Sequence, residues 1–112
     1  MAGGFCVVLV SAPAGKPSRK IADTLLDARL AACVQILPGV ESRYWWEGKQ
    51  RVGRESLLLI KTRRSHVKRI EKAVTAVHPY CTPEILSVPV LSGNAPYLAW
   101  LSAETTSRRA KE

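Results

Sequence analysis

The stretch that decides the fold is LAACVQILPGVESRYWWEG, residues 30–48. Successive side chains from Cys33 to Ile36 alternate in character, which predicts a β-strand with one buried face. Pro38-Gly39 interrupts this strand, which resumes at Val40 and runs through Trp46. A turn then leads into a second strand, residues 51–62, so that the two strands form a long hairpin. Its outer part extends beyond a small sheet. The backbone groups there either pair with another strand or remain an exposed edge.

The other elements are predicted from apolar runs, helical spacing and capping residues. In chain order they are a strand Phe5–Ser11 buried on both faces, a helix capped by Ser18 and ending near Ala31, the hairpin, a helix capped by Ser65 and ending at Val77, an edge strand Ile85–Val90 containing Pro89, and a helix Tyr97–Thr105 preceded by Pro96. This order predicts an α+β fold, the ferredoxin-like split βαβ sandwich (βαββαβ plus a C-terminal helix), with an antiparallel sheet and helices on one face.

Length and composition set the broad class. We expect 112 residues to form one domain, 1–112, with residues 106–112 as a frayed tail. No apolar run approaches the about 20 residues of a membrane span, and no export signal is recognised, so the chain is expected to be cytoplasmic.

Three cysteines without a C-x-x-C spacing argue against a disulfide framework and a four-ligand zinc site, and Cys6 is expected to be buried.

The positive charge is unevenly distributed. The net charge is +8, and residues 61–72 contain six basic residues and one acidic residue, a net of +5. Such a segment attracts anions, but it is also typical of a solvated helix face. No aromatic residue interleaves with these bases, so we do not expect nucleic acid as a partner. His66 lies among them and is expected to be a surface residue.

Catalysis is not indicated. His78 and Cys81 are a possible base and nucleophile, but no orienting group follows at a recognisable spacing. The chain has no glycine-rich phosphate loop and no paired acidic motif. We therefore predict that the protein is not an enzyme.

The aromatic run Tyr44-Trp45-Trp46 indicates self-association. Consecutive side chains of a strand point to opposite faces, so Trp45 lies opposite Tyr44 and Trp46. A domain this small cannot easily bury both faces of a hairpin. The run is the best sign of oligomerisation that the residues themselves provide.

A second stretch, HPYCTPE at residues 78–84, adds a resemblance. Together with residues 30–48 and the ordered pieces Ser11–Pro13, Leu58–Thr62 and Tyr97–Leu101, it resembles the CutA divalent-cation-tolerance family from Val7 to Leu101. The resemblance implies a homotrimer whose hairpins pair between subunits. It also implies a role in tolerance to divalent cations such as copper, by binding or sensing them near a subunit interface.

The candidate metal ligands are His78, Cys81 and Glu84, because thiolate and imidazole suit copper or zinc. Their spacing matches no standard motif. Copper ligands of some bacterial family members, a Cys on the first strand and two adjacent His, fall on Val10, Val77 and His78 in this chain. Only His78 can coordinate, so we expect copper or another divalent cation to bind weakly and no cofactor to be required.

The resemblance also implies a pocket near the place where subunits meet. Its predicted residues are Gln35, Tyr44, Trp46, Glu55, Lys61, Tyr80, Glu84 and Trp100. A buried Lys61 beside Glu55 or Glu84 would equally form an ion pair that binds nothing. An alternative function is a trimeric regulatory module similar to PII signalling proteins, which binds a small anionic ligand and partner proteins and is not a metal protein. The basic segment 61–72 favours this alternative.

Overall fold

The computed structural model describes residues 4–106, so the end of the predicted tail, residues 107–112, lies outside the described part. The elements, in chain order, are β1 (Phe5–Ala12), α1 (Lys16–Asp27), β2 (Cys33–Trp46), β3 (Lys49–Arg63), a 3-10 turn η1 (Arg64–His66), α2 (Val67–Val77), β4 (Ile85–Pro89) and α3 (Ala95–Glu104). The predicted βαββαβ order with a terminal helix is confirmed. Within residues 4–106, no helix combines the length and the apolar character needed to cross a bilayer.

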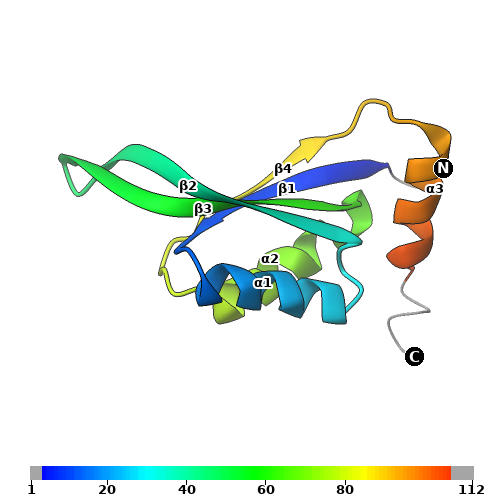
Figure 1. Ribbon diagram of the computed structural model, residues 1–112, viewed down its shortest axis with the longest axis horizontal. Helices are drawn as coiled ribbons and strands as arrows, with labels where there is room; N and C mark the ends of the chain where they lie inside the picture. The colour runs from blue at the N-terminus through cyan, green and yellow to red at the C-terminus, as the bar shows by residue number, and fades with distance from the viewer. Residues whose placement is uncertain (1–3, 107–112) are drawn as a thin grey trace.

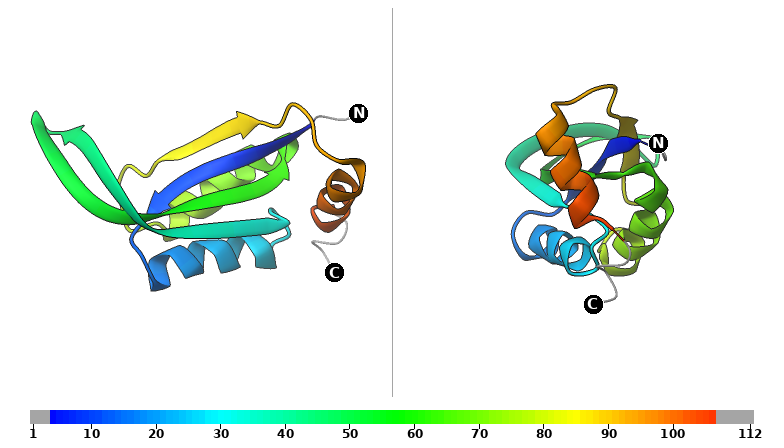
Figure 2. Two further views of the ribbon diagram at one scale, coloured as in Figure 1. Left: turned by 45° about the horizontal axis from the view of Figure 1, so that its top comes forward. Right: turned by 90° about the vertical axis from the view of Figure 1, so that its right-hand side faces the viewer.

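The four strands form one antiparallel sheet in the order β2-β3-β1-β4. Helices α1 and α2 lie side by side on one face, and α3 stands beyond one end of the sheet (Figures 1 and 2). Pro89 is the last residue of the edge strand β4, where a missing N–H is tolerated, as predicted. The sheet therefore has a covered face and an open face, the latter opposite α1 and α2.

The core lies between the sheet and the two helices. Buried apolar side chains alternate along β1 and β3 and meet those of the helices: Cys6, Val8, Val10, Ala12, Leu58 and Ile60 from the strands, and Ile21, Leu25, Ile70 and Val74 from the helices. The prediction that Cys6 is buried is confirmed. The prediction that β1 is buried on both faces is wrong for the single chain, because Val7 and Leu9 lie on the open face and stay half-buried.

Two predicted helix caps are wrong. Helix α1 begins at Lys16 with Gly15 (φ 82°) at its N-cap, and the Ser18 hydroxyl donates to the carbonyl of Pro13 at 2.7 Å. Ser65 lies inside the η1 turn, and neither η1 nor α2 has a side-chain cap. A serine hydroxyl can donate to a nearby loop carbonyl instead of accepting an N–H at a helix terminus.

The hairpin extends well beyond the sheet. A register shift between Leu37 and Val40, with Gly39 at φ 73°, marks the point where it leaves. We call residues 40–55 the arm; it gives the molecule its longest dimension, 45 Å against 29 and 21 Å (Figure 1). Trp45 is 68% exposed and Trp46 46% exposed. The long hairpin is confirmed, and the single chain leaves both of its faces uncovered.

His66 is buried, not on the surface as predicted. It is 3% exposed, and its Nδ1 lies 3.2 Å from the carbonyl oxygen of Leu30. The Thr62 hydroxyl donates to the same carbonyl at 2.6 Å. These contacts tie the turn before α2 to the segment that follows α1.

This burial predicts a pH dependence of stability. Burial lowers the pKa of His66, the hydrogen bond to Leu30 opposes this, and the charges of Arg69 and Arg63 lower it further. The unfolded chain, with a His pKa of about 6.5, then binds more protons, so the free energy of unfolding falls as the pH drops below about 6.5. Urea unfolding at pH 7.5 and 5.5 should show a loss of unfolding free energy that is smaller in His66→Gln, by at most about 1.4 kcal/mol. Equal pH dependence in both proteins would contradict this.

Candidate functional site

The loop after α2, residues 78–84, is tied to the end of β1 by His78. This side chain is 8% exposed, and its Nε2 lies 2.8 Å from the carbonyl oxygen of Ser11. Its Nδ1 accepts the backbone N–H of Tyr80 at 3.1 Å. A ring nitrogen that accepts carries no proton, so the Nε2–H is the donor to Ser11. Both nitrogens of His78 are therefore used by the backbone.

A polar cluster lies where the arm leaves the sheet, and we call Ser42, Glu55, His78 and Tyr80 the arm-base cluster. The Glu55 carboxylate accepts the Ser42 hydroxyl at Oε1 and the Tyr80 hydroxyl at Oε2, each at 2.7 Å. The rings of Tyr80 and His78 are 4.7 Å apart between centroids. Burial raises the pKa of Tyr80 to about 12, helped by the hydrogen bond and charge of Glu55 and by Tyr44. The Tyr80 hydroxyl therefore stays protonated in the neutral range and donates a hydrogen bond to Glu55.

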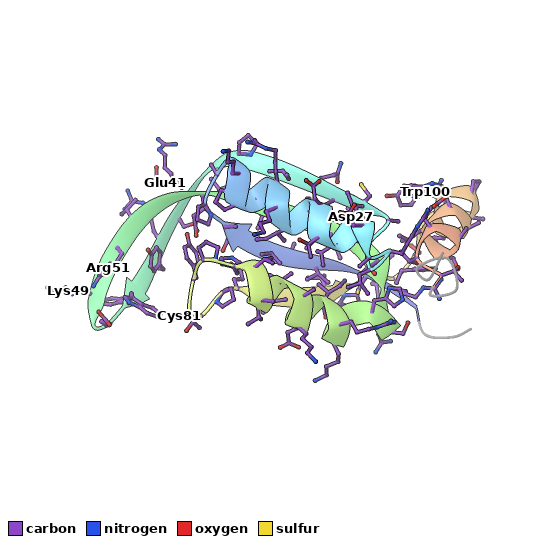
Figure 3. The ribbon with its side chains drawn as sticks, turned by 90° about the horizontal axis from the view of Figure 1, so that it is seen from below. Asp27, Glu41, Lys49, Arg51, Cys81 and Trp100 are labelled. Atoms are coloured by element: carbon purple, nitrogen blue, oxygen red, sulfur yellow. The ribbon has the colours of Figure 1, made fainter. Side chains whose placement is uncertain are left out.

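The single chain does not assemble the predicted metal ligands. The His78 nitrogens are turned toward Ser11 and Tyr80, whereas Cys81 is exposed at the foot of the arm (Figure 3). Glu84 Oε1 accepts the Ser11 hydroxyl at 3.3 Å. In the part of the chain that the structure describes, no three His, Cys, Asp or Glu side chains are placed to hold one ion. Cys81 and Glu84 remain as exposed groups able to coordinate.

The eight predicted pocket residues do not converge in one chain. Tyr44, Glu55, Tyr80 and Glu84 lie around the arm base, Trp46 lies farther out on the arm, and Gln35, Lys61 and Trp100 lie toward α3. Figure 3 shows Trp100 at the end of the molecule opposite Cys81.

In the part of the chain that the structure describes, Lys61 is hydrogen-bonded to Gln35 and not paired with Glu55 or Glu84. Its Nζ donates to Gln35 Oε1 at 2.6 Å across the open face, and among residues 4–106 it makes no ion pair with Glu55 or Glu84. The alternative of an internal ion pair is therefore wrong for the single chain. A lysine held by a neutral amide keeps its full charge available to a ligand or a second copy.

Sequence reasoning missed two hydroxyl groups of this site. The carbonyl of Ser11 accepts from His78, and its hydroxyl donates to Glu84. In the sequence, only its place in the matched piece Ser11–Pro13 pointed to this residue. Ser42 gave no signal, because its partner Glu55 is on the neighbouring strand and the contact depends on register.

Two surface depressions lie elsewhere, on the helices. One, of about 610 Å³, lies between α1 and the end of α2 and includes Lys16, Lys20 and Pro79; the other, of about 400 Å³, follows α2 and includes Lys68 and Lys72. None of the eight predicted pocket residues lines either depression. Lys68 and Lys72, two of the basic residues of segment 61–72, thus border a surface separate from the arm base.

Comparisons with known proteins agree with this architecture. The family model described as CutA1 divalent ion tolerance protein matches residues 6–104. The chain is 43% identical over 99 residues to the divalent-cation tolerance protein CutA of Thermus thermophilus, covering 88% of this chain and 96% of that relative. It is equally 43% identical over 99 residues to the chloroplastic protein CutA 1 of Oryza sativa, but spans only 56% of that relative's length.

A solved structure agrees with the fold. The crystal structure of CutA1 from Oryza sativa is similar with a TM-score of 0.90 at 41% identity, covering 93% of this chain and 95% of that one. The likeness therefore includes nearly all of the elements that position the arm base.

Proposed function

Because the chain belongs to the CutA1 divalent ion tolerance family, we propose that it acts in divalent-cation tolerance by binding the cation at a site that assembled copies complete. One observation carries this proposal: Cys81 is exposed on a loop that His78 ties to β1. With Glu84, one chain offers two ligands, fewer than the three or four protein ligands of ordinary transition-metal sites. The remaining ligands are proposed to come from another copy.

The proposed assembly is a homotrimer in which the arms pair between copies. The number three comes from the family resemblance. Exposed apolar side chains support association: Trp45 and Trp46 on the arm, and Leu37, Leu86 and Val88 on the sheet. Strands β2 and β4 are the two edges of the sheet, and each can accept a further strand. Association would cover the face that α1 and α2 leave open.

The proposed ligand is copper or another divalent cation of similar preference. A thiolate and a carboxylate favour transition metals over calcium or magnesium, which take oxygen ligands alone. Binding requires the thiol to lose its proton, so affinity should fall as the pH is lowered. The proposed act is binding rather than catalysis. The likenesses do not favour the PII-like alternative, and we propose no second function.

Calorimetric titration with Zn²⁺ and Cu²⁺ tests the proposal. Cys81→Ser and Glu84→Gln should each weaken binding about tenfold or more, because even indirect partners of a metal site contribute that much. Zn²⁺ has no redox chemistry, so oxidation of a thiol cannot imitate its binding. Cys33→Ser, at a thiol near the α3 end of β2, is the control and should bind as the wild type does. Unchanged isotherms for Cys81→Ser and Glu84→Gln would refute the site.

A further inference from the structure

We propose that the hydrogen bond from Tyr80 to Glu55 is a latch that holds the arm at the angle required for assembly. The inference rests on the association of copies proposed above, and it adds the residues that control this association. Tyr80 and Glu55 act here as positioning residues, because they set where the arm points.

The arm needs such a contact because little else fixes its direction. The register shift between Leu37 and Val40 interrupts the β2–β3 ladder at the point where the arm begins. Beyond it the arm is a two-stranded ribbon, which is marginally stable alone and strongly twisted. Among residues 4–106, Tyr80 Oη to Glu55 Oε2 is the only side-chain hydrogen bond that joins the arm to a residue outside it.

Both ends of this hydrogen bond are themselves held. On the arm, the Ser42 hydroxyl fixes the other oxygen of Glu55. On the loop, the Tyr80 ring packs against His78, and the backbone N–H of Tyr80 donates to His78 Nδ1. His78 in turn is bonded to the carbonyl of Ser11 in β1. A continuous series of contacts therefore runs from the central sheet to the base of the arm.

A small change of angle at the base becomes a large displacement at the tip. The seven residues from Val40 to Trp46 span about 23 Å at about 3.3 Å per residue. Tilting such a lever by about 10° moves its end by about 4 Å, close to the 4.7–4.9 Å spacing between paired strands. An arm whose end is displaced by that distance would no longer be in register with its partner strand on another copy.

The test compares Tyr80→Phe with the wild type as full-length proteins. Phe keeps the ring on His78 and removes only the hydroxyl. Concentration-dependent light scattering should show the association weakened about fivefold for each latch, on the order of a hundredfold when three latches act together. Thermal unfolding at concentrations where both proteins are dissociated should be nearly unchanged. Ser42→Ala, which removes the other donor to Glu55, gives a second variant should Tyr80→Phe fold poorly.

A matched pair of substitutions separates the latch from general effects of charge. Glu55→Gln should weaken association, whereas Glu41→Gln should not, because Glu41 lies on the opposite side of the same arm and, among residues 4–106, bonds only to Arg43. Combining Glu55→Gln with Tyr80→Phe should add little to either alone.

The outcomes distinguish the two proposals. A wild-type protein that stays monomeric at every concentration would overturn the assembly itself, and the latch with it. A wild type that associates while Tyr80→Phe associates equally well would overturn the latch alone. Strictly additive effects of Tyr80→Phe and Glu55→Gln would also overturn it, because the two residues would then act separately.

Discussion

Trp46→Ala is expected to dissociate the proposed assembly or to destabilise it strongly. Removal of a buried indole costs about 3–5 kcal/mol per site, and symmetry repeats the loss in every copy. In the single chain Trp46 is 46% exposed, so most of this cost depends on cover from another copy. Multi-angle light scattering should show the mass falling toward one chain. The melting temperature should fall and should depend on protein concentration.

The control for this result is an exposed apolar residue on the other side of the molecule. Leu26 lies on α1, away from the arm and from the open face, and its replacement by Ala should leave the mass unchanged. Such surface substitutions usually change stability by about 0.5 kcal/mol or less. If Trp46→Ala keeps both the mass and the melting point of the wild type, then the arm is not a contact between copies.

His78→Ala should lower stability without removing cation affinity from the folded protein. It leaves the carbonyl of Ser11 and the N–H of Tyr80 without their partner. An unsatisfied buried group costs about 1–3 kcal/mol, and these two groups are only partly buried, so we expect a loss of about 2–4 kcal/mol in urea unfolding. The Cu²⁺ isotherm, normalised to folded protein, should lose less affinity than in Cys81→Ser, because neither nitrogen of His78 is available to an ion and the residue acts only through the loop that carries Cys81.

Two conservative variants make this prediction sharper. The amide of Asn can reach the position of Nδ1 and that of Gln the position of Nε2, so His78→Asn and His78→Gln should each recover part of the lost stability. Each should also recover part of the Cu²⁺ affinity that His78→Ala loses, because the loop that carries Cys81 is held again. A variant that loses Cu²⁺ affinity while its unfolding free energy stays that of the wild type would show that His78 is a ligand after all.

The predicted helix caps failed for local reasons that a sequence pattern does not contain. Ser18 has the residue type of an N-cap, but the preceding loop brings the carbonyl of Pro13 within 2.7 Å of its hydroxyl.

The prediction for His66 failed for a long-range reason. His66 lies in a basic segment, a pattern that predicts exposure. His66 is buried because the fold places it against a segment far away in the sequence. Its Nδ1 lies beside the carbonyl oxygen of Leu30, 36 residues earlier in the chain.

The sequence by itself determined the elements of this protein, because helix and strand periods are written in neighbouring residues. Alternation at residues 33–36 and the interruption at Pro38-Gly39 were enough to predict the long hairpin and its bend. Only the tertiary structure decided which polar groups meet. Tyr80 and Glu55 are 25 residues apart, Lys61 and Gln35 are 26 apart, and each pair depends on strand register and loop path. A hydrogen bond requires its atoms within about 3 Å, a tolerance that residue type and spacing along the chain cannot supply.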